Sequence, residues 1–212
     1  MPHPANERAR RVAVRARQPR TQLLPQSFYH RDARLVAPEL LNKILTAADG
    51  RSGRIVEVEA YCGAIDPAAH TYRGKTKRNA TMFGPPGHMY VYFTYGMHWC
   101  ANTVCGGVGD GSGVLLRALE PLSGLEQMRT ARMSVQRDRD LCSGPGRLTQ
   151  ALGISGAHDG IELFSGNAPF AIVSDGTPPP PLRAGSARIG ISRGQEHWWR
   201  WFVEGNSNVS RR

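Results

Sequence analysis

The chain has 212 residues, of which 40% are apolar, and 27 Lys and Arg against 17 Asp and Glu give it a formal net charge of +10. This length suits one well-buried domain, and no stretch approaches the roughly 20 apolar residues that span a bilayer. A strongly basic protein attracts polyanions, with nucleic acid first and anionic membrane surfaces second. We expect a location in the cytoplasm of a bacterium or the nucleus of a eukaryote.

The positive charge is concentrated near the N-terminus. Residues 1–34 hold eight arginines against Glu7 and Asp32, which accounts for +6 of the net charge. We expect residues 1–20 to form a disordered basic tail and residues 21–212 to form one folded domain. The tail is expected to contribute electrostatic attraction to nucleic acid, so that deleting it flattens the salt dependence of non-specific binding.

Apolar periodicity and turn residues predict a mixed α/β domain. Asp32 is expected to cap a helix, and Leu41, Ile44 and Leu45 are spaced for one helical face, with Pro38 near a first helical turn. The other elements, in chain order, are a strand over 54–61, a loop over 64–86, two β-rich runs within 89–105, a connector over 106–113, a strand over 114–119, a helix over 121–139, a helix after Pro145, a surface connection over 175–181, and strands over 187–191 and 198–203.

Two carboxylates share one side of the first long strand. Alternation places Val56, Val58 and Ala60 on one side and Ile55, Glu57, Glu59 and Tyr61 on the other. An exposed sheet face would explain both glutamates, whereas a cleft floor beside Tyr61 would make one of them a base for a water nucleophile. Arg117, inside an apolar strand, needs an anionic partner. The pattern does not decide which glutamate pairs with it.

The segment from His88 to Trp99 contains five aromatic rings and two histidines in twelve residues. Tyr95-Gly96 falls where this segment would turn, which places a tyrosine at the tip of a hairpin. An aromatic sheet core with a Tyr-Gly turn is one explanation. The other is that flat rings stack on an unpaired base while the tip wedges into a duplex.

Together, these residues closely resemble the alkyladenine (3-methyladenine or 3-methylpurine) DNA glycosylase family. The matching runs are Arg54 to Tyr61, Asp66 to His70, Arg78-Asn79 with Met82-Phe83, Tyr90 to Tyr92 with Tyr95 to Met97, Asn102, Val114 to Pro121, Leu141 to Pro145 and Arg188 to Gly190. Each run is weak alone, but their order and spacing are highly specific. The resemblance implies a single catalytic domain over 21–212, with an antiparallel sheet core, surrounding helices and a protruding β-hairpin that intercalates into DNA.

The resemblance also implies a role for each candidate site residue. The catalytic glutamate falls on Glu59, and Arg117 matches the arginine that helps to hold the water. The pocket for the flipped base falls on Tyr61, His70, Tyr92 and Asn102. The intercalating tyrosine falls on Tyr95, and the DNA-backbone positions fall on Thr76, Arg78 and Met82. The chain departs from the family in a longer loop at 106–109 and in Tyr72-Arg73, which makes the substrate range less certain than the chemistry.

The implied activity is a monofunctional glycosylase that releases 3-methyladenine, 7-methylguanine, hypoxanthine or ethenoadenine from double-stranded DNA and leaves an abasic site for base excision repair. It implies no cofactor and no metal, and we expect a monomer. The four cysteines lack CxxC spacing, which also disfavours a zinc site. Two alternatives are a lyase that uses the Pro2 amine and a non-catalytic nucleic-acid-binding module.

Overall fold

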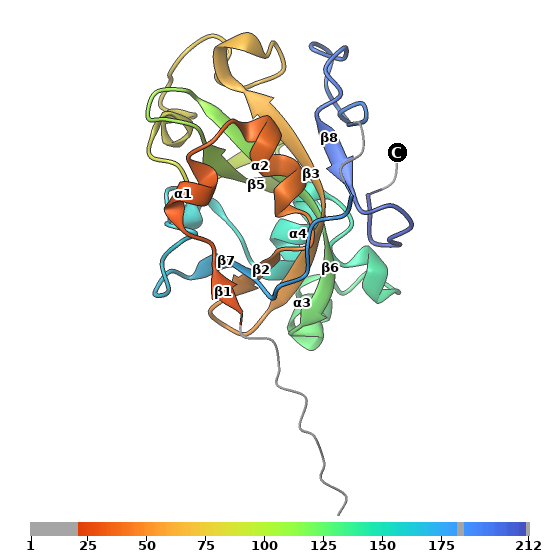
Figure 1. The fold of residues 1–212 in the computed structure, drawn as a ribbon. Coiled ribbons are helices and arrows are strands. Elements are labelled where there is room, and N and C mark those ends of the chain that lie inside the picture. The colour runs from red at the N-terminus through yellow and green to blue at the C-terminus, as the bar shows by residue number, and fades with distance from the viewer. Residues whose placement is uncertain (1–20, 182–184, 211–212) are drawn as a thin grey trace, which may run out of the picture.

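In the part of the chain that the structure describes, eight strands form one curled sheet, and they pair antiparallel throughout (Figure 1). The computed structural model describes residues 21–181 and 185–210. The strand order is β1-β7-β2-β3-β6-β5-β4, and β8 pairs with β3 outside that order. The strands are β1 Gln22–Leu23, β2 Ile44–Ala47, β3 Ser52–Cys62, β4 Met89–Thr94, β5 His98–Cys105, β6 Ser112–Ser123, β7 Phe170–Ser174 and β8 Arg200–Phe202.

The helices pack on this sheet and complete the core. They are α1 Gln26–Tyr29, α2 Ala33–Leu40, α3 Leu125–Ala131 and α4 Pro145–Leu152, with 3₁₀ turns η1 Gly63–Ile65, η2 Ala80–Phe83, η3 Asp138–Asp140 and η4 Gly156–His158. Helix α2 contacts β3, and α4 contacts β5. Leu40 of α2, Leu116 of β6 and Leu148 of α4 have no exposed surface and belong to one hydrophobic cluster. The mixed α/β class with an antiparallel sheet is therefore confirmed.

Helix α2 begins after Asp32, as predicted, and ends earlier than predicted. The Asp32 side chain accepts a hydrogen bond from the Arg34 N–H at 2.8 Å and caps α2. Pro38 lies inside α2 rather than near its first turn, and the helix ends two residues later. Asn42 then adopts a positive φ of 66°, and Ile44 and Leu45 enter β2. The expectation that they share a helical face was wrong.

Strand β3 contains an irregularity that simple alternation does not show. Its register with β6 shifts between Ile55 and Glu57 and again before Val58. Ile55 consequently packs in the same core cluster as Val58 and Ala60, instead of lying with the glutamates. Glu57 and Glu59 are both fully buried, so the exposed-face explanation of the two carboxylates is wrong.

Two predictions near the C-terminal half were also wrong. Residues 121–123 continue β6 because Pro121 and Ser123 lie opposite Gly53 and Ser52, and α3 begins only at Leu125 and ends at Ala131. Residues 187–191 form no strand, because the Ile189 N–H donates to a side chain rather than to a neighbouring strand. The strand predicted over 198–203 is shorter, Arg200–Phe202. The tail prediction for residues 1–20 lies outside the described residues.

Candidate active site

A cavity of about 320 Å³ opens where β3, β4, β5 and β6 meet the loop that follows residue 188. Its volume lies in the range of small-molecule sites. Most of the predicted site residues line it: Tyr61, His70, Met82, Tyr92, Tyr95, Asn102 and Arg117. Pro67, Ala68 and residues 189–193 contribute further walls. Residues 106–109 and Tyr72-Arg73, where the chain departs from the family pattern, are not part of the lining.

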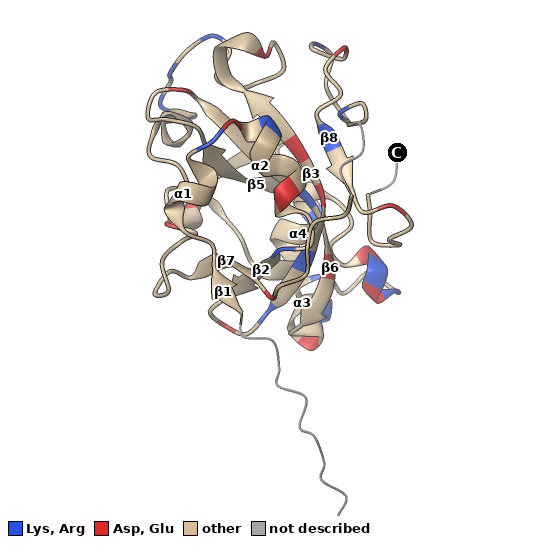
Figure 2. Cartoon of the chain, in the orientation of Figure 1, with Lys and Arg blue, Asp and Glu red and all other residues tan. Residues whose placement is uncertain are grey.

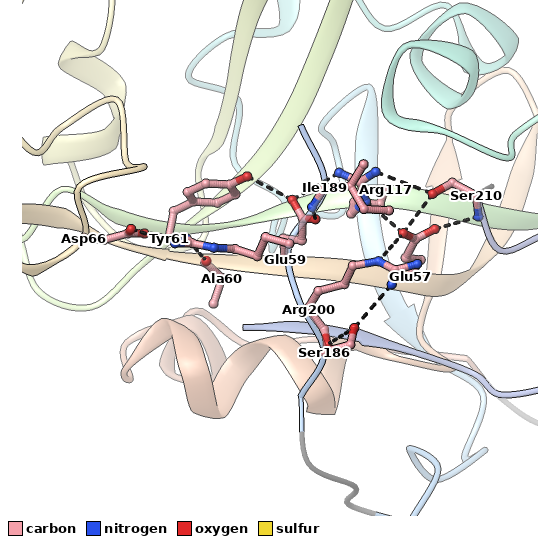
Figure 3. A network of polar contacts seen from close by, with 11 residues as sticks. Glu57, Glu59, Ala60, Tyr61, Asp66, Arg117, Ser186, Ile189, Arg200 and Ser210 are labelled. Atoms are coloured by element: carbon pink, nitrogen blue, oxygen red, sulfur yellow. Dashed lines mark hydrogen bonds and ion pairs between the residues drawn. The ribbon is translucent and has the colours of Figure 1, made fainter. Parts of the chain in front are cut away.

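Glu59 is fully buried, and its carboxylate is held by two hydrogen bonds and one ion pair from groups that line the cavity (Figure 3). Oε2 accepts a hydrogen bond from the Tyr61 hydroxyl at 2.9 Å and lies 3.1 Å from Nη1 of Arg117. Oε1 accepts one from the Ile189 N–H at 2.7 Å. Burial, and then the charge of Glu59, raise the pKa of Tyr61 well above its ordinary value, so this phenol remains a donor. These three groups fix the orientation of the carboxylate, although Glu59 itself is not part of the cavity lining.

Glu57, two residues earlier, has no partner in the cavity wall except Arg117. Its Oε1 accepts hydrogen bonds from Nε of Arg117 and Nε of Arg200, both at 2.8 Å, while Ser210 donates its N–H and its hydroxyl. Burial acts to raise the pKa of Glu57, but the charge of Arg117 and the donors from Arg200 and Ser210 outweigh it and lower that pKa. Figure 2 shows the acidic part of β3 beside the basic start of β8. Glu57 is thus the structural partner of the arginines.

Arg117 joins the two carboxylates. Its side chain is nearly buried, and it reaches Glu57 through Nε and Glu59 through Nη1. Burial opposes its charge, but Glu59 and Glu57 together raise the pKa of its guanidinium. The prediction that a buried arginine here needs a carboxylate is confirmed, and it has two.

The aromatic rings at the other side of the site form a cluster. The His70 and Tyr92 ring centroids lie 4.4 Å apart in an edge-to-face arrangement, and Tyr90 stacks on Tyr92 at 5.5 Å. The Nδ1 atom of His70 lies 3.4 Å from the Tyr90 hydroxyl. Lost hydration, and then the charge of Arg78, lower the pKa of His70, which keeps its imidazole neutral near pH 7. Asn102 donates to the Tyr90 carbonyl at 3.2 Å and is held in the wall.

Tyr95 lies in the turn between β4 and β5. These strands pair as antiparallel neighbours up to Thr94 and His98, as expected from the Tyr-Gly turn. Tyr95 and Gly96 have φ values of 52° and 66°, and the Tyr95 side chain is 78% exposed. Its insertion into DNA stays a prediction.

The three residues expected at the DNA backbone have different surroundings. Thr76 and Arg78 are exposed, and Arg78 donates to the Phe93 carbonyl at 2.9 Å beside the Tyr92 ring. Met82 is only 4% exposed and packs with Tyr90. Contacts of all three with DNA stay predictions.

A sequence model of the family described as methylpurine-DNA glycosylase (MPG) matches residues 27–207. The chain belongs to this family. A Burkholderia lata protein named "Putative 3-methyladenine DNA glycosylase" is 69% identical over 188 residues, which cover 89% of this chain and 91% of the relative. Proteins with the same name from Rhodopseudomonas palustris strain HaA2 and Streptomyces avermitilis are 49% and 46% identical, and each match covers 88% of this chain and 90% of the relative.

Membership of the methylpurine-DNA glycosylase family confirms that the protein is a DNA glycosylase of the 3-methyladenine or methylpurine class, an enzyme of alkylation-damage repair that acts on DNA. Among the described residues, no group of three or more His, Cys, Asp or Glu could hold a metal ion. No helix in the described ranges is long and apolar enough to cross a membrane.

Sequence reasoning missed three contributors to the site. The Ile189 N–H is a backbone group, which has no side-chain signature. Ser210 and Arg200 reach Glu57 from 153 and 143 residues away. The only feature of the sequence that could have indicated the role of Arg200 is its position as a basic residue within the strand predicted over 198–203.

Proposed function

We propose that this glycosylase flips an alkylated or deaminated purine out of double-stranded DNA and hydrolyses its N-glycosidic bond with a water that Glu59 activates. The proposed lesions are 3-methyladenine, 7-methylguanine, hypoxanthine and ethenoadenine, and the product is an abasic site. The observation that carries the proposal is the buried Glu59 carboxylate, which two hydrogen bonds and one ion pair connect to residues that line the cavity. A positioned carboxylate of this kind suits general-base catalysis.

The carboxylate geometry supports this chemistry. A carboxylate has about four acceptor positions. Hydrogen bonds from Tyr61 and Ile189 occupy two of them, and Arg117 forms an ion pair with the same carboxylate. In the proposed reaction, a water molecule takes one of the remaining positions. Glu59 takes a proton from this water as its oxygen attacks C1′ of the sugar, and the electrons of the broken bond leave with the base. A cationic alkylated base leaves readily, whereas a neutral base requires protonation.

The aromatic cavity walls support recognition of a flipped purine. Tyr61 on one element and the His70–Tyr92 pair on others offer faces and edges for a planar base. A neutral His70 does not repel a cationic lesion, and the tyrosine rings attract one. In this proposal Asn102 crowds the position of a guanine amino group. Tyr95 fills the gap in the duplex, and Thr76, Arg78 and Met82 lie toward the backbone.

The proposed enzyme is monofunctional and acts as a monomer. A lyase needs an amine that reaches the sugar. The chain has only Lys43, Lys75 and Lys77, and none of them lines the cavity. A duplex incubated with the enzyme and borohydride should form no covalent adduct.

Substitution of Glu59 tests the proposal directly. The Glu59→Gln variant should lose excision of hypoxanthine by roughly 10²- to 10⁴-fold, because an amide cannot take the proton from water. Its affinity for a duplex with an abasic-site analogue should persist, since no DNA contact is removed. Single-turnover excision on the four lesions and a binding titration provide the measurements. Excision by Glu59→Gln at the wild-type rate would disprove the role of Glu59.

A further inference from the structure

A second buried ion pair, Arg188 with Asp66, lies directly behind the cavity. Both side chains have no exposed surface. Nη1 of Arg188 donates to Oδ2 of Asp66 at 2.6 Å, and Nη2 donates to Oδ1 at 2.8 Å. The guanidinium also donates to the carbonyls of Ala60 and Gly194 at 3.0 and 3.2 Å. Such a pair offsets the cost of burying its charges only when its hydrogen bonds are satisfied. Nη1 and Nη2 of Arg188 are paired in this way, whereas its buried Nε has no hydrogen-bond partner among the described residues.

The guanidinium of Arg188 lies against two aromatic rings. Its Cζ lies 4.7 Å from the ring centroid of Tyr61 and 5.1 Å from that of Trp199. His197 stacks on Trp199 at 4.1 Å and extends the stack. Because Tyr61 is a cavity wall and the donor to Glu59, a fixed cation against this ring restricts where both the ring and its hydroxyl lie.

The ion pair also joins the two loops that form adjacent cavity walls. Asp66 directly precedes Pro67 and Ala68 and accepts hydrogen bonds from the N–H groups of Cys62 and Ala68. Arg188 directly precedes the lining segment 189–193, whose first N–H donates to Glu59 at 2.7 Å. Gly194, which follows this segment, packs closely against the ion pair, since a Cβ at this position would lie 3.0 Å from Nη2 of Arg188.

We propose that Arg188, held by Asp66, is the positioning residue of this active site. It acts through two neighbours, the Tyr61 ring and the Ile189 N–H, which together orient the Glu59 carboxylate toward the cavity. The inference rests on the proposed function of Glu59. Arg188 itself touches neither water nor base, so its loss should slow the chemical step and affect DNA binding much less.

The test compares Arg188→Lys with a matched control. Lysine keeps the charge but lacks the two-pronged geometry and the planar stacking of arginine. Arg54→Lys is the control, because Arg54 makes a similar two-pronged pair with Asp175, at 3.4 and 2.7 Å, away from the cavity. The single-turnover excision rate of Arg188→Lys should fall roughly 10- to 100-fold, as expected for a slightly misplaced catalytic group. Arg54→Lys should excise like the wild type.

Three further readouts separate positioning from simple unfolding. The fraction of active Arg188→Lys, titrated with an abasic-analogue duplex, should equal that of Arg54→Lys, and its affinity for that duplex should stay near the wild-type value. Asp66→Asn should reproduce the slower rate. If Arg188→Lys excises as fast as Arg54→Lys, or loses rate only in proportion to its active fraction, the inference is wrong while the proposed function stands. If the wild type releases no base, both are wrong.

Discussion

Glu57 and Glu59 show how neighbours, rather than residue type, divide two carboxylates between structure and chemistry. Both are fully buried on β3, and both contact Arg117. Glu57 receives its other hydrogen bonds from Arg200 and Ser210, whereas Glu59 receives its own from groups that line the cavity. Glu57 therefore holds distant segments together, whereas the contacts of Glu59 connect it to the cavity lining, as its proposed catalytic role requires.

This division predicts a large stability effect at Glu57. Glu57→Gln leaves two buried arginines with one anion fewer, and removal of one partner from a buried pair typically costs 3–5 kcal/mol. We expect the free energy of unfolding in urea to fall by about that amount. The control is Glu39→Gln, whose partner Arg31 and whose own carboxylate are partly exposed, so its effect should be about 0–1 kcal/mol. Equal losses in the two variants would contradict this role of Glu57.

For individual residues, the sequence predicts which face of a strand they occupy and which kind of partner they need, but it does not predict the partners themselves. Period-2 alternation places Glu57 and Glu59 on one side of a strand, and a lone arginine among apolar residues indicates that Arg117 has an anionic partner. The division of labour depends on Ser210 and on the Ile189 N–H. Because these groups come from segments far along the chain, no local pattern reveals them.

The turn between β4 and β5 is the element in which backbone strain and proposed function coincide. Tyr95 has a φ of 52°, in the left-handed region that residues other than Gly, Asn and Asp avoid. Strain of this kind costs about 1–3 kcal/mol and is concentrated at functional sites. The sequence predicts this turn because Tyr95 is followed by Gly96, and hairpin loops favour glycine where φ is positive.

Tyr95→Asn should therefore separate stability from function. Asparagine tolerates the left-handed conformation, so the free energy of unfolding should stay constant or rise by up to about 1 kcal/mol. Excision of hypoxanthine from a fully paired duplex should fall, because the side chain proposed to fill the gap is lost. Excision from a mismatched duplex, where flipping costs less, should fall less. A variant that is less stable than the wild type and still excises normally from paired DNA would contradict both expectations.

Other elements show where local patterns fail. Pro121 favours the start of a helix, yet it lies opposite Gly53 because β6 continues along β3. The pattern of residues 187–191 predicts a strand, yet the Ile189 N–H donates a hydrogen bond to the Glu59 carboxylate. In both cases a partner more than 60 residues away decides the conformation, and tertiary pairing overrides local propensity.

At the scale of the whole molecule, the sheet brings segments that are far apart in the sequence to one site. β3 is paired with β2, β6 and β8, so segments from residues 44 to 202 converge on the strand that carries Glu57 and Glu59. The resemblance of motifs between residues 54 and 145 predicts the family and most of the cavity lining. It does not predict the C-terminal contribution, because most of residues 185–210 lie outside those motifs.

Acid stability should depend on several Arg–carboxylate pairs distributed over this fold. A hydrogen bond from Arg54 lowers the pKa of Asp175, and one from Arg51 lowers that of Asp49. The pKa of Glu57 is lowered as well, where Arg117 and the other donors outweigh its burial. When the pKa of a carboxylate is lower in the folded state than in the unfolded state, the unfolded state takes up the proton at a higher pH than the folded state does. Its stabilisation is therefore complete above the unfolded pKa and is lost as the pH falls through the folded pKa.

The free energy of unfolding should accordingly decline as the pH falls below about 4.5, near the unfolded pKa values of Asp and Glu. Denaturant titrations at a series of pH values measure this slope. Asp175→Asn should lower the free energy of unfolding at neutral pH and flatten its decline with pH, because one carboxylate that takes up a proton on acid unfolding is removed. The sheet and the cavity should be unaffected. Since Glu57 has four donors, Glu57→Gln should flatten the decline as well. A decline of unchanged slope in both variants would show that other groups control the acid response.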